Sequence, residues 1–475
     1  MRRKPPHSGK PRPKLSQVGA FTQMIAQDWE VGGREAQIVP GAAQAAEQHR
    51  NRLSAAIGQR DVVIFSGHAP LRNNDCYFEY RADSSFVWLT GAAIEFACLI
   101  LRANGKSHDA ELYLKPPARP GVNEFFSSAA YGELWVGPSP GLNDWETALG
   151  IRVTDISELA SDLEKLENPC VSGTLSSDEL TQYSLLATGE VDKLLSDLRM
   201  YKDAWEIEQL QAAVAASVGG FEAVAAELTH AIEIERGERW LQGTFDRHAR
   251  TFGNGPGFTS IAGSGPHAPT LHWIRCDGPI IADMPLLLDM GVETYSLYTA
   301  DITRTIPPTG HFSPAGRQVH DLVAKAHRAA LAAAVNRAHF LDAEYAAMEV
   351  IAGGLHDWGI LKVSVDEALS PDGQQHRRYI VCGVSHHLGL DVHDCAKSDS
   401  AYDAGLHLAP GMVFTVEPGV YFHAHDLTLP PELRGVGVRI EDDVWIRPDG
   451  AQQILTDALP FDTTEVEEWT QSHLS

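Results

Sequence analysis

Apolar positions recur with two different spacings along the chain, and the change falls near residue 195. Before it, a helix over 43–57 leads into short apolar runs, bounded by turn residues, that predict strands at 61–67, 84–91, 96–102 and 110–115. Strands that alternate with helical patterns are typical of an α/β fold. We therefore predict an α/β domain over residues 46–195.

The remainder of the chain, residues 196–475, opens with helical spacing. Its apolar periodicity predicts two long amphipathic helices that end near residue 252. Turn-rich strand segments follow, and Ser313 with Pro314 marks the start of another helix through residue 334. A partner helix is expected over 342–358, and the final third returns to strands. This order predicts an α+β domain whose sheet is assembled from distant segments.

The beginning of the chain differs from both domains. Its first residues, MRRKPPHSGKPRPK, are basic and rich in proline, and they lack the apolar core of a secretory signal. We expect residues 1–45 to form a disordered basic tail and an arm with a short helix around 21–29. No run of about 18 apolar residues occurs, so no transmembrane helix is expected. These features predict a cytoplasmic location.

The net charge limits the partners that we expect, and the cysteines indicate the redox compartment. The chain has 63 acidic and 38 basic residues, which gives a net charge of -25. A nucleic-acid partner favours a basic face, and an anionic membrane repels acidic protein, so we expect neither partner. The six cysteines form no CxxC pair and mostly lie in apolar segments, which indicates free thiols in a reducing compartment.

The last quarter of the chain places polar residues inside apolar, glycine-flanked runs: CGVSHHLGLDVHD, FTVEPG and GVGVRIEDD. A buried polar group without a partner is costly, so repeated burial points to a bound cation or an opposite charge. Aspartates in the upstream runs LLLDMG and TADITRT complete an oxygen-rich set: Asp289, Asp301, His386, Glu417 and Glu441. Such a set suits a pair of divalent ions.

Each of these motifs alone has a second interpretation. Asp289, which lies two residues before Gly291, is either a turn cap or a ligand. Asp301 lies on the next strand, and the turn between the strands can bring both carboxylates to one spot. Two carboxylates that close could not both ionise without a cation between them, so the spacing indicates a bridging pair.

The histidines and the last glutamate are ambiguous as well. His386 and His387 are neighbours on a strand or tight turn, so at most one of them faces the site. Glu441 shares a strand face with Arg439, and a buried salt bridge between the two is the alternative to a metal ligand.

The order of the motifs resembles the creatinase/aminopeptidase family, whose catalytic domain has the pita-bread fold, and within it the aminopeptidases P. The matching runs are RNNDCYFEYRADSSFVWLTG, TLHW, LLLDMG, ADITRT, GVSHHLGLDVHD, TVEPGVY and RGVGVRIEDD. The resemblance implies an α/β N-terminal domain plus an α+β pita-bread catalytic domain. It also implies an enzyme that hydrolyses the peptide bond between an N-terminal residue and a following proline.

The resemblance assigns two divalent ions, with Mn²⁺ the usual metal. Asp301 and Glu441 would bridge both ions, Asp289 would bind one, and His386 with Glu417 would bind the other. A hydroxide held between the ions would attack the peptide carbonyl. Glu417 would pass its proton to the leaving nitrogen.

Further roles follow from the same resemblance. His272 and His393 match histidines that line the substrate site and hydrogen-bond the scissile carbonyl region. Relatives usually carry a histidine four residues before the ligand histidine, on the proline side of the substrate. Here Cys382 occupies that position, so Cys382 is expected in the substrate pocket.

A network beyond the ligands is expected as well. Relatives place an aspartate of the N-terminal domain near an arginine and a tyrosine that correspond to Arg439 and Tyr421. The matching residue is Asp75, and we expect Asp75, Arg439 and Tyr421 to position the metal-bound glutamates. The alternative is that Asp75 only caps a loop. Relatives with this N-terminal domain form dimers or tetramers, so a homodimer or homotetramer is implied.

Two other functions compete with this one. A dipeptidase (prolidase) of the same family also acts on Xaa-Pro but needs a group that holds the dipeptide carboxylate. A non-catalytic peptide-binding module on the same fold is disfavoured because all five ligand positions are filled. The expected partners are peptides with proline at position two.

Overall fold

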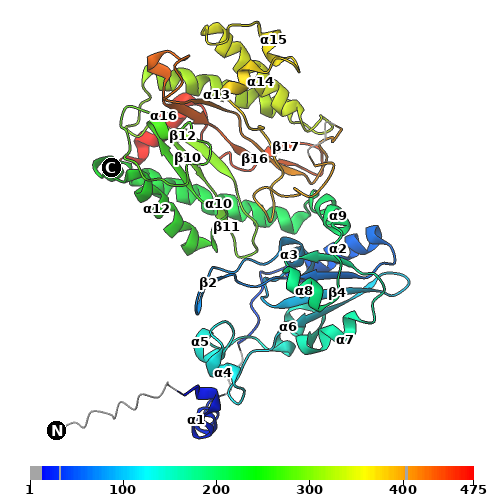
Figure 1. The fold of residues 1–475 in the computed structure, drawn as a ribbon. Helices are drawn as coiled ribbons and strands as arrows, with labels where there is room; N and C mark the ends of the chain where they lie inside the picture. The colour runs from blue at the N-terminus through cyan, green and yellow to red at the C-terminus, as the bar shows by residue number, and fades with distance from the viewer. Residues whose placement is uncertain (1–12, 31–33, 402–404, 475) are drawn as a thin grey trace, which may run out of the picture. The chain divides into compact units, whose positions relative to one another are not determined.

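The computed structural model describes residues 13–30, 34–401 and 405–474, and the chain divides into two compact units, Met1–Gly189 and Glu190–Ser475 (Figure 1). Most of the tail expected at the beginning of the chain, residues 1–12, lies outside the described residues. Two short helices belong to the expected arm: η1 (Leu15–Gln17) and α1 (Gly19–Ile25).

The first unit is built on a five-stranded mixed sheet with the order β6-β5-β4-β1-β7. β1 pairs antiparallel with β4 and parallel with β7, while β5 pairs antiparallel with β4 and parallel with β6. A separate hairpin carries Asp75 in its turn. The strands are β1 (Val62–Phe65), β2 (Leu71–Asn73), β3 (Cys76–Tyr77), β4 (Ala97–Ala103), β5 (His108–Leu114), β6 (Arg152–Asp155) and β7 (Cys170–Gly173).

Short helices complete this unit, as expected for an α/β fold. They are α2 (Ala42–Ile57), α3 (Ser84–Thr90), α4 (Glu124–Ser127), α5 (Glu133–Val136), α6 (Leu142–Leu149), η2 (Ile156–Glu158), α7 (Leu159–Leu163) and α8 (Ser177–Gln182).

The strand expected at 84–91 is wrong, because this segment forms helix α3. The Asp83 side chain caps the helix and accepts hydrogen bonds from the backbone N–H of Ser85 (2.9 Å) and of Phe86 (3.2 Å). Trp88 is buried and stacks on His49 of α2, with ring centroids 4.3 Å apart. Short apolar runs do not distinguish strand from buried helix, and here the cap and the packing on α2 decide.

The second unit begins with helices, as the periodicity predicts. The two long helices expected up to residue 252 are α10 and α12, with the short α11 between them. Ser313 caps α13 by accepting from the N–H of Gly316 (3.2 Å). The helices are α9 (Glu190–Arg199), α10 (Ala204–Ala226), α11 (Leu228–Glu233), α12 (Gly237–Phe252), α13 (Pro314–Ala333), α14 (Asp342–Asp357), α15 (Val365–Leu369) and α16 (Thr463–His473).

Four small sheets form the centre of this unit, and in Figure 1 they lie between α13 on one side and α10 with α12 on the other. Their orders are β12-β10-β9, β13-β16-β17, β14-β15 and β11-β8. The strands are β8 (Gly255–Pro256), β9 (Ile261–Ser264), β10 (Leu286–Met290), β11 (Val292–Glu293), β12 (Ile302–Ile306), β13 (Val413–Val416), β14 (Gly419–Phe422), β15 (Val436–Arg439), β16 (Asp442–Ile446) and β17 (Gln452–Ile454). Strands from distant segments therefore meet, and the expected α+β class is confirmed.

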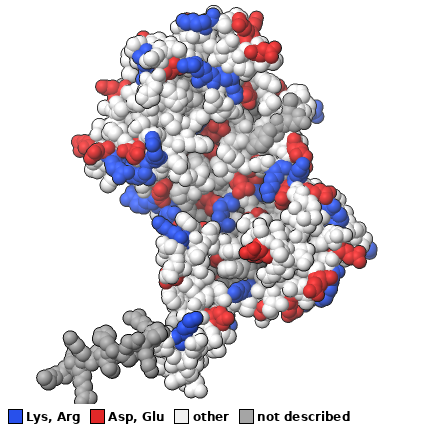
Figure 2. All heavy atoms as spheres, in the orientation of Figure 1, with Lys and Arg blue, Asp and Glu red and all other residues white. Residues whose placement is uncertain are grey.

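Short 3₁₀ helices interrupt the connections of the second unit: η3 (Gly265–His267), η4 (Gln375–Arg378) and η5 (Pro431–Leu433). Acidic and basic side chains are interspersed over the visible surface of each unit (Figure 2). None of the helices formed by the described residues has the length and apolar character needed to cross a membrane. All six cysteines are free; Cys76 is exposed, Cys382 is half-buried and the other four are buried.

Candidate metal centre

Two antiparallel strands bring the upstream aspartates together. Asp289 lies near the end of β10 opposite Thr303 of β12, and Asp301 immediately precedes β12. Both aspartates are buried. Burial, and then the nearby carboxylates of Asp289 and Glu417, raises the pKa of the Asp301 carboxyl well above its ordinary value.

The downstream glutamates meet across a second strand pair. Val416 of β13 pairs with Asp442 of β16, so Glu417, just after β13, and Glu441, just before β16, lie at the same end of this ladder. Burial, and then Asp301 and Glu417, raises the pKa of Glu441 well above its ordinary value. Burial also raises the pKa of Glu417, against the opposing effect of nearby charged groups.

His386 joins the two pairs of carboxylates. Its backbone N–H donates to the Thr415 hydroxyl (3.1 Å), and the Thr415 N–H donates to the His386 carbonyl (2.9 Å), which fixes the histidine beside β13. The Nε2 atom of His386 lies 3.3 Å from Oδ2 of Asp301 and 3.4 Å from Oε1 of Glu417. Asp301, His386 and Glu441 each place a ligand atom within 4.8 Å of the others.

The donor set fits divalent cations. Four carboxyl groups and one imidazole converge, and burial raises the pKa of three of the carboxyls, those of Asp301, Glu417 and Glu441. The buried Oδ1 atom of Asp289 has no hydrogen-bond partner among the described residues. Oxygen-rich sites with one imidazole suit hard divalent ions such as Mn²⁺. The five residues that the sequence singles out therefore form one cluster with the chemistry of a metal centre.

Arg439 pairs with Asp289 and not with Glu441, so the salt bridge considered as the alternative for Glu441 does not form. The buried guanidinium donates from Nη2 to Oδ2 of Asp289, from Nε to the Thr303 hydroxyl (3.0 Å) and from Nη1 to the Tyr421 hydroxyl (3.2 Å). Glu441 instead accepts from the hydroxyl of Thr303 (2.6 Å).

Sequence reasoning missed Thr303. Its hydroxyl accepts from Arg439 and donates to Glu441, so it links the guanidinium to the carboxylate. The signal was available, because residues two apart on a strand share a face and Thr303 follows Asp301 by two positions.

The three acids of the RIEDD run have separate roles, because successive strand residues face opposite sides. Glu441 faces the cluster. Asp442 turns away, and its Oδ1 atom lies 2.6 Å from Nη2 of the buried Arg304. Asp443 is buried and accepts from the N–H of Asp301 (3.3 Å). The last two acids therefore support the backbone around Asp301 and Glu441.

The cluster opens into a cavity of about 680 Å³. All five residues of the cluster line it, together with Tyr421 and Arg439. Part of the remaining wall is apolar and is formed by Phe258, Ile261, Leu271, Ile274 and Val392. The cavity therefore combines an acidic end with an apolar wall.

His272 and His393 line the same cavity and are exposed there. The rings of His393 and His386 meet edge to face, with centroids 4.4 Å apart. Partial burial, and then the neighbouring His386 and His272, lowers the pKa of His393. A neutral imidazole can donate one N–H to a ligand in the cavity.

A buried carboxylate that the sequence did not reveal holds the loop of His272. Glu238 of α12 accepts from the backbone N–H of Ser264, from Nδ1 of His267, from Nε1 of Trp273 and from the N–H of Gly278, each at 2.8 Å. These four bonds fix the segment on both sides of His272. An acidic residue on an amphipathic helix gives no sequence signal for such a role.

Cys382 lines the cavity and is half-buried, as expected for a pocket residue. Burial, and then the Glu417 carboxylate, raises the pKa of its thiol. His387 faces away from the cavity: it is fully buried and stacks on Phe340, with centroids 4.7 Å apart. Burial lowers the pKa of His387 to about 3. Of the two neighbouring histidines, only His386 lines the cavity.

Asp75 belongs to the first unit, where it is exposed in the turn between β2 and β3. Its carboxylate accepts from Nδ2 of Asn74 (3.0 Å). The Arg439–Tyr421 part of the expected network is present in the second unit, and the participation of Asp75 stays a prediction.

Comparison with known proteins gives two family matches. Residues 208–448 match metallopeptidase family M24, and residues 46–173 match the aminopeptidase P N-terminal domain. The chain is 40% identical over 440 residues to Xaa-Pro aminopeptidase 2 of Streptomyces coelicolor, covering 90% of this chain and 91% of that protein. It is 31% identical over 429 residues to a Xaa-Pro aminopeptidase of Haemophilus influenzae, covering 89% and 96%.

Solved structures show the same likeness. Aminopeptidase P from E. coli, in a low-pH form, superposes with a TM-score of 0.80 at 26% identity, covering 92% of this chain and 99% of that one. The aminopeptidase PepP of Pseudomonas aeruginosa gives a TM-score of 0.78 at 26% identity, with the same coverage. The E. coli protein has also been solved in a zinc-substituted form with product and with the inhibitor Pro-Leu.

Proposed function

The chain belongs to metallopeptidase family M24, and on this basis we propose that it is an aminopeptidase that hydrolyses the bond between an N-terminal residue and a following proline. The observation that carries the proposal is the cluster of four carboxyls and one imidazole at the end of a peptide-sized cavity. The names of the curated relatives supply the substrate class.

The proposed ligands of two divalent ions all line the same cavity: Asp289, Asp301, His386, Glu417 and Glu441. Asp301 and Glu441 would be shared between the ions. Mn²⁺ is the proposed metal, since carboxylate oxygen dominates the donor set. Two bound ions supply Lewis acidity, which lowers the pKa of water and polarises a peptide carbonyl at neutral pH.

The side chains of this chain then provide the proton transfer. Burial raises the pKa of Glu417. A raised pKa suits a carboxylate that takes up a proton at Oε1 and delivers it to the leaving nitrogen. His386 Nε2, at 3.4 Å from this oxygen, keeps it in place. Arg439 and Tyr421 hold the opposite side of the cluster through their contacts with Asp289 and with each other.

The apolar wall of the cavity would select substrates with proline at position two. Proline has no N–H and a fixed ring, so an apolar wall receives it without leaving a donor unpaired. Cys382 lines the cavity near Tyr421 and Glu417 and would contact the substrate. His272 and His393 also line the cavity and would donate hydrogen bonds to the carbonyl oxygen, where negative charge develops.

We propose the location of the enzyme from its free cysteines and its oligomeric state from its relatives. Six free cysteines support a reducing, cytoplasmic location. Homo-oligomers, either dimers or tetramers, are proposed by analogy with relatives that carry this N-terminal domain, and light scattering would measure them.

The test uses a tripeptide Xaa-Pro-Yaa and the dipeptide Xaa-Pro. We expect cleavage of the tripeptide, loss of that activity with a chelator and its recovery with Mn²⁺. Asp301→Asn and Glu441→Gln should each lose at least one ion by elemental analysis, whereas the exposed control Asp449→Asn should keep both. Cleavage of the dipeptide alone would show a prolidase, and full activity without metal would refute the proposed centre.

A further inference from the structure

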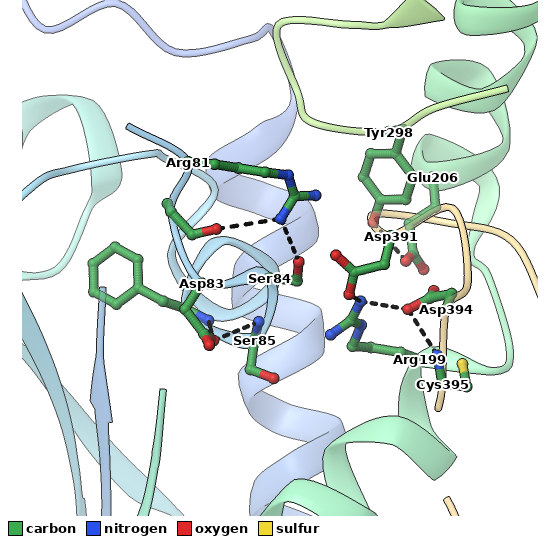
Figure 3. A network of polar contacts seen from close by, with 12 residues as sticks. Arg81, Asp83, Ser84, Ser85, Arg199, Glu206, Tyr298, Asp391, Asp394 and Cys395 are labelled. Carbon is green, nitrogen blue, oxygen red and sulfur yellow. Dashed lines mark hydrogen bonds and ion pairs between the residues drawn. The ribbon is translucent and has the colours of Figure 1, made fainter. Parts of the chain in front are cut away.

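A buried ion cluster joins the end of α9 to Asp391 and Asp394, and Asp394 directly follows His393 in the sequence (Figure 3). Arg199, the last residue of α9, donates from Nη2 to Oδ1 of Asp394 and to Oδ2 of Asp391 (2.8 Å). Lys202 places Nζ 3.2 Å from Oδ2 of Asp394. The side chains of Asp394 and Lys202 are 2% and 0% exposed, so both charges are withdrawn from water.

Asp394 also fixes the backbone turn in which it stands. Its Oδ1 atom accepts from the N–H of Cys395 (2.9 Å), and its own N–H donates to the carbonyl of His387 (2.9 Å). Cys395 adopts a left-handed backbone with φ of 60°, which is uncommon for a residue other than glycine. Such a conformation persists when its surroundings determine it, and the Asp394 carboxylate is part of those surroundings.

The Asp394 carboxylate occupies space that is free because residue 389 is a glycine. A Cβ atom placed on Gly389 would lie 2.1 Å from Oδ2 of Asp394, so no side chain fits at position 389. The Gly389 N–H donates to the Asp391 carbonyl (3.1 Å), which closes the loop on itself. Asp394 is thus enclosed by Arg199, Lys202 and the loop backbone.

The same loop presents its histidines to the cavity. His386 and His393 both line it, with their rings in contact, whereas Asp394 is buried away from it. The residue that anchors the loop and the residue that faces the substrate are therefore adjacent in sequence.

Buried ion clusters contribute little net stability compared with apolar packing, and their better-supported use is to select one conformation. Two cations on a single carboxylate, together with a backbone N–H, specify one position for Asp394. We infer that Asp394, held by Arg199 and Lys202, is a positioning residue that sets the orientation of His393 toward the substrate. The inference rests on the proposed peptidase function for its kinetic part.

The test is a double-mutant cycle. Asp394→Asn removes the charge at constant size, and we expect kcat on a Xaa-Pro-Yaa peptide to fall about 10–100-fold, the usual effect of losing a group that orients an active-site residue. In a His393→Ala background the same substitution should cost less than about threefold, because the residue it positions is gone. Equal losses in both backgrounds, or a wild-type kcat for Asp394→Asn, would overturn the inference.

The matched control is Glu467→Gln on α16. Glu467 is also a buried carboxylate that accepts from an arginine, Arg317, and from a backbone N–H, that of Phe312 (2.9 Å), but it does not line the cavity. Its substitution should lower thermal stability and leave kcat unchanged. Lys202→Met, which removes one cation and keeps the side-chain length, enters the same cycle if Asp394→Asn does not fold.

Amide hydrogen exchange separates this inference from the proposed function. The Cys395 amide should exchange faster in Asp394→Asn and in Lys202→Met than in wild type or in Glu467→Gln. This measurement requires no peptide hydrolysis. Wild-type protein that cleaves no Xaa-Pro peptide would refute the proposed function alone, whereas unchanged exchange at Cys395 would refute the positioning role.

Discussion

Arg439 donates from Nη2 to Oδ2 of Asp289, so a guanidinium is paired with one of the carboxylates of the proposed metal centre. The pairing commits one oxygen of Asp289 to Arg439, while the buried Oδ1 atom has no hydrogen-bond partner in the part of the chain that the structure describes. Asp289 therefore has one oxygen fixed by protein and one oxygen available to an ion.

Replacement of Arg439 by lysine should lower kcat about 10–100-fold, as is typical for groups that orient metal ligands. Lysine keeps the charge but cannot reach Asp289, Thr303 and Tyr421 together, because it lacks the planar fork of arginine. The control is Arg434→Lys, since among the described residues Arg434 donates only to the backbone carbonyls of Leu429 (3.0 Å) and Leu427 (3.4 Å). Steady-state kinetics with metal analysis measures the effect, and an unchanged kcat would remove Arg439 from the mechanism.

Cys382→His should change kcat or KM for Xaa-Pro peptides without changing the metal content, because Cys382 lines the cavity beside Tyr421 and Glu417. Unchanged kinetics with several peptides would show that Cys382 only packs as a small apolar residue.

Alkylation of Cys382 should inactivate the enzyme slowly at neutral pH and faster as the pH rises. The thiolate is the reactive form, and burial raises the pKa of this thiol, so the thiolate fraction is small at pH 7 and grows about tenfold per pH unit below the pKa. Inactivation by iodoacetamide at several pH values measures this dependence. The Cys382→Ala variant should resist it, and loss of its activity at the wild-type rate would assign the effect to another cysteine.

Asp75→Ala should lower kcat about 10–100-fold while the fold and the ion content stay intact, if Asp75 joins Arg439 and Tyr421 in orienting the glutamates. Asn74→Ala, a change in the same hairpin turn, is the control. A wild-type kcat for Asp75→Ala would mean that the carboxylate serves only its own turn, where it accepts from Asn74.

The unfolding free energy should fall as the pH drops from about 6.5 to 3, in part because of His320. Burial lowers the pKa of His320 to about 3, whereas an unfolded histidine titrates near 6.5. Between these values the unfolded state binds the extra proton, so stability rises with pH, by up to about 1.4 kcal/mol per pH unit for one group. Chemical denaturation of His320→Gln across this range should give a shallower slope than wild type, and an equal slope would contradict the prediction.

The sequence predicted which residues gather at the proposed metal centre better than it predicted their supporting contacts. Carboxylates inside apolar strands stand out because burial without a partner is costly, and this argument found Asp289, Glu417 and Glu441. The partner of Arg439 depends on the register between β10 and β12, which no local pattern contains. The alternative pairing with Glu441 rested on neighbours within one strand and was wrong for that reason.

Two other features of the structure could not be predicted from local sequence patterns. Residues 84–90 have the composition of a strand but form α3, because the Asp83 cap and the packing on α2 outweigh intrinsic preference. Glu238 of α12 anchors the loop of His272 from another part of the fold, and Asp394 anchors the loop of His393 through its contacts with the distant Arg199 and Lys202. A buried acid on a helix or in a loop becomes recognisable only when the donors around it are known.

The Glu441 N–H donates to the carbonyl of Thr303 (3.0 Å), so the proposed metal centre closes only where a late segment of the chain meets an early one. Glu441 follows Thr303 by 138 residues in the sequence. A ribosome releases the chain from its N-terminus, and the catalytic unit cannot assemble before this residue has emerged. The proposed site for the ions can therefore be completed only after Glu441 has been synthesised, and a translation product cut short before Glu441 would lack one of the five proposed ligands.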